Sequence, residues 1–419
     1  MADFFQAIDQ FPVTLKHWLM TQLGGVLPEW AEPLVSAALS ITPILAVFPL
    51  MFALTTVIER KGLGRIQNRI GPNRVGIPLT NIRLAGFGQF IADGIKSLIK
   101  EDVVPRAADK VVHFLAPIAL LIPVLLTYSV LPFGRNMVPL DLPQTGLLFF
   151  FAVGASTELS VFMAGWSSRN KYSLLGAMRA IAQMVSYEIP LILSALTVVM
   201  MAGTLSLSGI VERQMWHVAM PGIPGDQDGL LARWFLFTPW GLVGFFLFLT
   251  AAAAEANRTP FDLPEAESEI IAGYFTEYSG FKFAIFFLAE YLGLFAMCGL
   301  GITLFLGGWL PPVNFAPFTW IPSWCWFLGK LSALIVLFIW LRGTLPRLRT
   351  DQLMGFAWKF LLPMTLINLV VAALWHLLAN SIPLVARWPL CFAMLAVPYW
   401  LLGRGFEAKF TKREYRFAN

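Results

Sequence analysis

Four glutamates lie within or at the end of long apolar stretches of this chain: Glu158, Glu188, Glu255 and Glu290. A charge at the centre of a membrane costs about 2.5 to 3.5 kcal/mol to insert, so such residues usually face a bundle interior and mark a pathway or a paired site. The alternative for each is a protonated or hydrogen-bonded glutamate that only joins helices. At 1.5 Å per helical residue, Glu188 and Glu290 are predicted at similar depth, where they could share one polar cavity.

An acidic segment, residues 255–282, has a net charge of −4. Asp262 is a predicted helix N-cap with Glu265 at the third helical position. Helical spacing then places Asp262, Glu265 and Glu269 on one face and Glu267 on the opposite one. Crowded carboxylates raise one another's pKa, while a helix N-terminus or a nearby arginine lowers it, so this face is a candidate for protons that respond to a neighbouring event. A solvated acidic first turn is the simpler interpretation.

Two other segments between apolar runs are basic. They are ERKGLGRIQNRIGPNRVG (59–76) and RGTLPRLRTDQL (342–353). The first departs from the GxGxxG pattern and no GK[ST] follows, so it does not predict nucleotide binding. Such charges often face lipid headgroups. The density of glycine and proline in the first segment favours a fixed, packed loop instead.

The composition requires these charges to be positioned by membrane helices. The 419 residues are 57% hydrophobic and 13% charged, whereas soluble domains are about a quarter charged, which excludes a soluble globular enzyme. Apolar runs predict an all-α polytopic membrane helix bundle of nine spans: 33–58, 111–131, 145–166, 181–202, 235–254, 283–307, 324–341, 355–378 and 388–403. The last is short and contains Pro398, so it could be re-entrant, which would leave an eight-helix core.

The basic residues predict the orientation of the bundle. With the N-terminus outside, 23 of the 30 Lys and Arg residues fall in the segments on the inside and 5 in those on the outside. The whole chain, 1–419, is predicted to be one membrane domain with an N-terminal arm (1–32), a charged loop (59–110), the acidic loop (255–282) and a basic tail (404–419). Phe4, Phe5, Phe11 and Trp18 of the arm are candidates for contact with the membrane interface.

An amphipathic helix is predicted within the loop at 59–110. In LAGFGQFIADGIKSLIKED, apolar residues such as Phe87, Ile91 and Ile95 recur at helical spacing, while Gln89, Asp93, Lys96 and Lys100 occupy the other side. The helix is expected to lie flat at the membrane surface or to cover the mouth of a cavity, and the simpler alternative is a cytoplasmic helix that packs on neighbouring loops.

The motifs together identify a family. The strings ERKGLGRIQNRIGPNRVG, SLLGAMRAIAQMVSYE, AEANRTPFDLPEAESE followed by EYSGFKFAIFFLAEY, and LPRLRTDQLM strongly resemble the membrane protein at the heel of respiratory complex I, the proton-translocating NADH:quinone oxidoreductase. The family comprises the H subunit of bacteria and subunit 1 of mitochondria. The resemblance covers about residues 40–378 and implies a chamber for a lipid-soluble quinone and the first part of a proton path. It also implies partner subunits: a hydrophilic quinone-reducing arm with FMN and iron-sulfur clusters, and small and antiporter-like membrane subunits. This chain itself would bind quinone and lipid, and no cofactor, metal ion or nucleic acid.

The resemblance also assigns roles to individual residues. First-loop charges that match the family at the chamber are Glu59, Arg60, Arg69, Asp93 and Glu101. The acidic proton path and its arginine are matched by Glu188, Glu255, Arg258, Asp262, Glu265, Glu267, Glu269, Glu277 and Glu290. The basic loop that faces this path is matched by Arg342, Arg347 and Arg349. Glu158 matches no motif of the family, and the region after 380 extends beyond the eight-helix core.

Three other classes of protein remain as alternatives. A secondary transporter also has carboxylates in its spans but is expected to show inverted repeats, which are not seen here. A haem-binding cytochrome is disfavoured because His113 and His376, the two histidines nearest the spans, are predicted at opposite faces of the membrane. The membrane subunit of a related membrane-bound hydrogenase shares the ancestry without needing a quinone. The three cysteines, Cys298, Cys325 and Cys391, have no spacing typical of a metal site.

Overall fold

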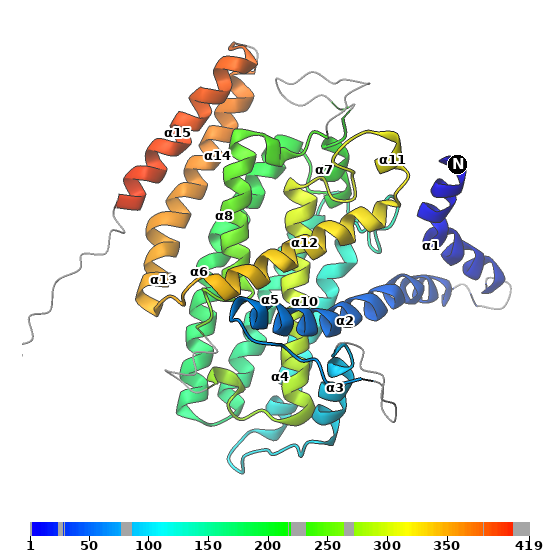
Figure 1. Ribbon diagram of the computed structural model, residues 1–419, viewed down its shortest axis with the longest axis vertical. Helices are drawn as coiled ribbons and strands as arrows, with labels where there is room; N and C mark the ends of the chain where they lie inside the picture. The colour runs from blue at the N-terminus through cyan, green and yellow to red at the C-terminus, as the bar shows by residue number, and fades with distance from the viewer. Residues whose placement is uncertain are drawn as a thin grey trace, which may run out of the picture.

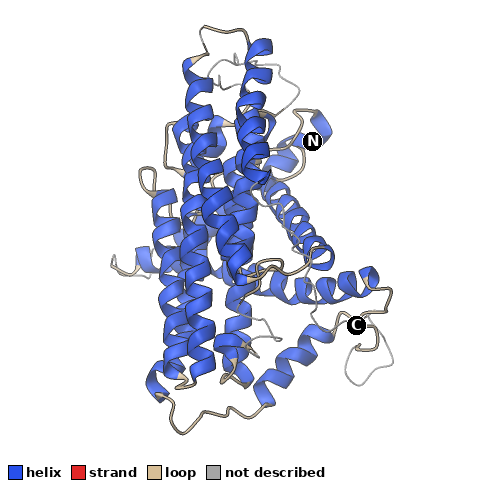
Figure 2. Cartoon of the chain, turned by 90° about the vertical axis from the view of Figure 1, so that its left-hand side faces the viewer, coloured by secondary structure: helices blue, strands red, loops and turns tan. Residues whose placement is uncertain are grey.

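The computed structural model describes residues 2–23, 28, 30–76, 86–216, 218, 232–263, 272–379 and 381–404, without the side chains of residues 2–6, 316 and 317. No β-strand occurs in these ranges, and Figure 2 shows helices joined by loops. Among the described residues, eight helices are long and apolar enough to cross a membrane, and a ninth apolar helix, α8 (Pro239–Glu255), is shorter. Each of the nine predicted spans therefore contains a helix, and the prediction of a membrane helix bundle is confirmed.

Upright helices form the centre of the bundle (Figure 1). They are α4 (Lys110–Thr127, extended by the 3-10 turn Tyr128–Val130), α5 (Gly146–Ser167), α6 (Lys171–Ala202), α8 and α10 (Gly280–Phe305). Large buried side chains, including Trp240, Phe248, Phe295 and Phe305, form the main core between them. Two further long helices, α2 (Glu32–Ile66) and α12 (Ser323–Thr344), run obliquely across the front of this group (Figure 1).

The remaining elements lie around this centre. At one edge, α14 (Leu362–Leu377) and α15 (Leu384–Arg404) lie side by side (Figure 1). Short elements occupy the connections: α7 (Leu207–Arg213), a 3-10 turn (Phe235–Phe237), another (Gly273–Phe275), α11 (Ala316–Thr319), α13 (Thr350–Phe356) and a π-helical turn (Ala357–Leu361) that leads into α14. The candidate for a re-entrant segment, 388–403, lies in α15, whose 21 residues are long and apolar enough to span.

Polar caps explain where several spans begin. Asp109 accepts hydrogen bonds from the backbone N–H groups of Val111 (3.2 Å) and Val112 (3.4 Å) at the start of α4. Asn170 accepts one from Tyr172 (3.0 Å) at the start of α6, and Gly203 ends that helix at φ 69°. Such caps satisfy backbone donors that have no partner within the helix.

Two boundaries differ from the sequence prediction. Helix α6 begins ten residues before the predicted 181, and α2 continues to Ile66 past the predicted end at 58. Hydropathy marks where a helix leaves lipid, not where its hydrogen bonds end. As a consequence Glu59 and Arg60 lie on a rigid helix and not in a loop. The N-terminal arm is also helical, as α1 (Ala2–Leu23), with Phe11 and Trp18 exposed; the side chains of Phe4 and Phe5 lie outside the described residues.

The predicted amphipathic helix is α3 (Gln89–Ile99). Its apolar side chains Phe87, Ile91, Ile95 and Leu98 are exposed, and none of its residues is buried. No residue of this helix is therefore buried against neighbouring loops in the described part of the chain, and its contact with lipid stays a prediction.

Candidate functional site

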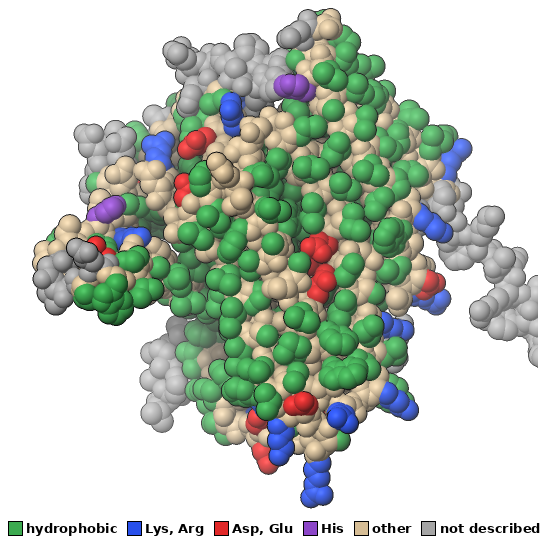
Figure 3. All heavy atoms as spheres, turned by 180° about the vertical axis from the view of Figure 1, so that it is seen from behind, with side chains coloured by type: hydrophobic (Ala, Val, Ile, Leu, Met, Phe, Trp, Pro, Cys, Tyr) green, Lys and Arg blue, Asp and Glu red, His purple; other side chains and the backbone are tan. Residues whose placement is uncertain are grey.

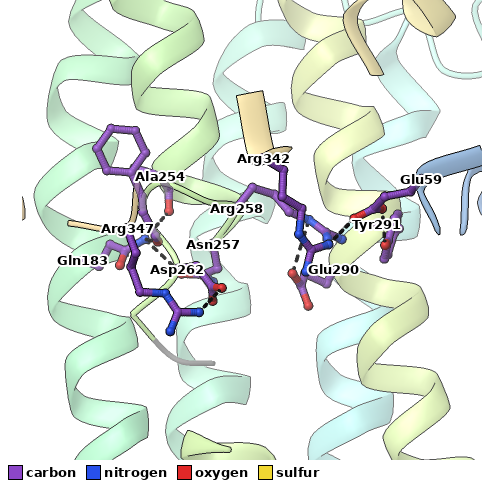
Figure 4. Close-up of polar contacts among 11 residues, drawn as sticks. Glu59, Gln183, Ala254, Asn257, Arg258, Asp262, Glu290, Tyr291, Arg342 and Arg347 are labelled. Carbon is purple, nitrogen blue, oxygen red and sulfur yellow. Dashed lines mark hydrogen bonds and ion pairs between the residues drawn. The ribbon is translucent and has the colours of Figure 1, made fainter. Parts of the chain in front are cut away.

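A buried group of opposite charges joins three helices and a loop, and we call its five residues the charge cluster (Figure 4). Glu59 of α2 accepts a hydrogen bond from the hydroxyl of Tyr291 (2.6 Å) and forms an ion pair with Arg342 of α12. Arg258, in the loop after α8, forms an ion pair with Glu290 of α10 at 3.4 Å (Nε to Oε1). Its guanidinium also stacks over the Tyr291 ring at 3.8 Å, so Tyr291 connects the two ion pairs.

Burial makes the electrostatics of the charge cluster strong. The side chains of Glu59, Arg258 and Glu290 are 7, 8 and 10% exposed. Burial alone lowers the pKa of Arg258, but the nearby carboxylate of Glu290 outweighs it and raises this pKa above its usual range. Arg258 is therefore a permanent cation, and two carboxylates balance two guanidinium groups. A change of protonation at either acid alters the net charge where solvent screens it poorly.

The loop that carries Arg258 is held by Gln183 of α6 (Figure 4). The side-chain amide of this fully buried glutamine donates to the backbone carbonyls of Ala254 (2.7 Å) and Phe261 (2.6 Å) and to the side-chain oxygen of Asn257 (3.2 Å). Asn257 turns the chain with a φ of 49°, a conformation that asparagine tolerates better than most residues. One buried side chain thus fixes both ends of the loop.

Asp262 links the same loop to the basic segment 342–353. Its Oδ2 accepts a hydrogen bond from Arg347 at 2.6 Å, and the backbone N–H of Leu348 donates to the carbonyl of Pro260 at 3.2 Å. The Asp262 side chain is 5% exposed and that of Arg347 is 37% exposed. The acidic and basic segments that were paired by charge in the sequence therefore meet in the fold.

A second group of acids comprises Glu158 of α5, Glu188 of α6 and Glu255 at the end of α8. Their carboxylates interact electrostatically with one another. A cavity of about 80 Å³ reaches from Glu255 to Glu290 of the charge cluster, with Thr157 and Asn257 among its few polar lining residues. At roughly 30 Å³ per molecule it has room for two or three waters. A space large enough for water therefore lies between Glu255 of this group and Glu290 of the charge cluster.

The expectation that Glu188 and Glu290 line one cavity was wrong, because Glu255 takes the place of Glu188. Tyr187 explains the difference. Its buried hydroxyl points toward α13 and donates to the carbonyl of Leu353 (2.9 Å). Successive helical residues differ by about 100° in direction, so Glu188 points elsewhere and remains half-buried. Figure 3 shows a small group of acidic side chains in the middle of one face, surrounded mainly by hydrophobic side chains.

The other predicted site residues lie apart from the charge cluster. Arg60 pairs with Asp93 of α3 (2.6 Å), Arg69 donates to the side chain of Gln67 (2.8 Å), and Glu277 accepts from Asn170 (2.7 Å). Glu101 is exposed, and Arg349 lies beside Arg179 at an open hollow. Glu265, Glu267 and Glu269, with the helix predicted to begin at Asp262, lie outside the described residues, as do residues 405–419 of the basic tail.

Sequence reasoning missed the neutral residues that organise the site. Tyr291 and Gln183 carry no charge and therefore gave no signal in a search for charges in apolar runs. Tyr291 directly follows Glu290, and Gln183 lies within a string that was noted for its resemblance only. A polar residue next to a buried carboxylate, or a glutamine in an apolar helix, is the signal that could have found them.

Comparison with known proteins identifies the family. A model described as NADH dehydrogenase matches residues 39–373, a range that contains both groups of acids. The chain belongs to the NADH dehydrogenase family. It is 50% identical over 325 residues to the H subunit of NADH-quinone oxidoreductase from Dehalococcoides mccartyi strain CBDB1, covering 78% of this chain and 82% of that relative.

Other relatives of the family carry the same name. The H subunit from Geobacillus kaustophilus is 47% identical over 360 residues, which cover 86% of this chain and 98% of that protein. The H subunit from Bacillus cytotoxicus is 48% identical over 319 residues, which cover 75% of this chain and 86% of that protein. The family model ends before α15 begins. The resemblance found in the sequence motifs is therefore confirmed, and the chain is an integral membrane member of this family.

Proposed function

We propose that this chain is the H subunit of an NADH:quinone oxidoreductase, that it forms part of the quinone chamber, and that it begins the proton path. The single observation that carries the proposal is the charge cluster, which is buried, balanced in charge and connected by a cavity to Glu255, the nearest member of the second group of acids. Such an arrangement suits a coupling element, because it holds protonatable groups close together in a poorly screened environment.

The proposed chemistry starts with the quinone. Reduction of a quinone to a quinol consumes two electrons and two protons, and it therefore changes the local charge near the inside ends of α2, α10 and α12. Arg258 interacts with both Glu290 and Glu59, so a proton lost or gained by either acid changes how strongly the arginine holds the other. The change passes to Glu255 through water in the cavity, and from there to Glu188 and Glu158.

Electrons are proposed to arrive from partner subunits. The three cysteines of this chain lie in α10, α12 and α15, whereas an iron-sulfur cluster usually needs four thiolates close together. We therefore assign FMN and the iron-sulfur clusters to the hydrophilic arm. The charged inside loops, with Arg60, Arg69, Glu101 and Arg349 exposed, are proposed to contact that arm on the cytoplasmic side, with the N-terminus outside. The surrounding membrane is proposed to be the bacterial cytoplasmic membrane.

The test replaces Glu255 by Gln in the assembled complex. We expect quinone reduction and proton pumping to fall together, or pumping to fall more, because an amide preserves the shape and cannot carry the proton. Glu212→Gln is the matched control, since Glu212 is an exposed acid in α7, away from both groups. Native gel electrophoresis is used to check that both variants assemble. Normal pumping in Glu255→Gln would exclude this residue from the path.

A further inference from the structure

A pocket of about 280 Å³ lies far from the charge cluster, at the end of the bundle where α12 begins. We call it the tryptophan pocket because Trp216, Trp309, Trp320 and Trp326 line it, together with Asp9 and Arg135. In Figure 1, α11 and α1 lie on this side, and α3 lies at the opposite end of the molecule. The volume is close to the lower limit for small-molecule sites, about 300 Å³.

One serine binds the side chain of Asp9 and the backbone of Arg135. Asp9 of α1 accepts hydrogen bonds from the backbone N–H and the hydroxyl of Ser323, both at 2.6 Å and both through Oδ1. The backbone N–H of Arg135 donates to the same hydroxyl oxygen at 3.0 Å. A methyl group on Gly134 would lie 2.8 Å from this oxygen, which is too close. The carboxylate of Asp9 and the backbone of Arg135, from distant parts of the sequence, thus meet at Ser323, and Arg135 is exposed.

A buried donor in the pocket lacks an acceptor. Trp309 is 5% exposed, and its indole Nε1 has no hydrogen-bond partner among the described residues. A buried N–H without an acceptor costs about 1 to 3 kcal/mol, which a ligand oxygen would recover. Beside it, Trp320 and Phe318 are partly exposed, and Phe318 stacks on Trp326 with ring centroids 5.8 Å apart. These rings offer flat surfaces on which a cation can bind.

We propose that the tryptophan pocket binds the headgroup of a zwitterionic phospholipid. Arg135 and the indole N–H of Trp309 bind the phosphate, while Asp9 and the exposed rings bind the ammonium group. One acid and one base favour a headgroup with both charges over an anionic one. The position also fits, because tryptophan collects at the level of lipid headgroups and α1 presents exposed Phe11 and Trp18 nearby.

The experiment uses the purified complex in mild detergent. A phosphatidylethanolamine with a photoreactive group in its acyl chain is crosslinked, and mass spectrometry quantifies labelling of peptides from residues 306–326. Unlabelled dioleoyl phosphatidylethanolamine and dioleoyl phosphatidylglycerol then compete for the site. We expect the ethanolamine lipid to compete about tenfold better, as the loss of one charged hydrogen bond would predict. Equal competition by the two lipids would overturn the proposal.

Three conservative variants assign the contacts. Arg135→Gln should lower the apparent affinity of the competing ethanolamine lipid about tenfold. Trp309→Phe, which removes only the indole N–H, should lower it about threefold. Asp9→Asn keeps an oxygen for Ser323 and should abolish the preference between the two lipids. Glu212→Gln and Arg213→Gln, exposed on α7 and outside the pocket, serve as controls. Labelling and competition unchanged in all three variants would show only an interfacial belt of aromatic residues and would refute the site. None of these measurements depends on quinone turnover.

Discussion

Replacing Arg258 by Gln should destabilise the complex more than any change in a surface ion pair. With an effective dielectric constant of about 20, the 3.4 Å contact with Glu290 corresponds to a Coulomb energy of roughly 5 kcal/mol. Loss of one partner from a buried pair costs about 3 to 5 kcal/mol, because the remaining charge loses its counter-ion. Glu290→Gln alone should cost less, since Arg258 still interacts with Glu59.

The double variant Arg258→Gln/Glu290→Gln decides whether this reasoning is correct. Removal of both charges leaves a neutral site, so at least about 2 kcal/mol of the loss should be recovered. The assay is the midpoint of heat-induced release of this subunit from the purified complex, followed on native gels. The same three variants, two single and one double, are made for the surface pair Arg60 and Asp93 as a control. These residues are closer, at 2.6 Å, but their side chains are 48 and 37% exposed. The interaction energy between them should therefore be less than about 1 kcal/mol. The argument would be refuted if the double variant were no more stable than Arg258→Gln. Equal interaction energies for the buried pair and the surface pair would refute it as well.

Three further predictions concern neutral or isolated polar groups. Gln183→Leu leaves the carbonyl of Phe261 without its side-chain donor and removes one of the hydrogen bonds to the carbonyl of Ala254, which still accepts from the backbone N–H of Asn257. An unsatisfied buried carbonyl costs about 1 to 3 kcal/mol, so limited proteolysis after residue 254 should become faster. Lys330→Met removes three hydrogen bonds of 2.6 to 2.8 Å to carbonyls after α10 and should lower the midpoint of heat denaturation, unlike Lys359→Met on the exposed surface. Burial raises the pKa of Tyr278 to about 12, so the folded state holds this proton where the unfolded state releases it; stability should fall between pH 10 and 12, and Tyr278→Phe should reduce that fall as measured by thermal melting.

The bundle could be predicted from sequence because lipid imposes a simple rule. A span must be apolar for about 20 residues, and each of the nine apolar runs contains a helix. The ends of the helices could not be predicted in the same way, because polar caps such as Asn170 and intrahelical hydrogen bonds, not hydropathy, decide where α6 and α2 begin and end.

The charged residues of the candidate site could be predicted from the sequence, but the ion pairs that they form could not. Acids in apolar runs stand out in a sequence, and so Glu255 and Glu290 were found. The partner of each acid depends on the direction of side chains from helices far apart in the chain, as with Glu59 and Arg342. Glu158 matched no motif, yet the fold brings it to Glu188 and Glu255.

The length of α2 has a mechanical consequence. It is one helix of 35 residues that contains Pro43 and Pro49, about 50 Å long, and its outer part is held to α1 by a hydrogen bond from Lys16 to Ser40. A pivot of only 5° about one end would displace the other by roughly 4 Å over this length, more than the 2.6 Å contact between Tyr291 and Glu59. A movement of the part of α2 beyond Pro49 is therefore expected to change the contacts that Glu59 makes in the charge cluster.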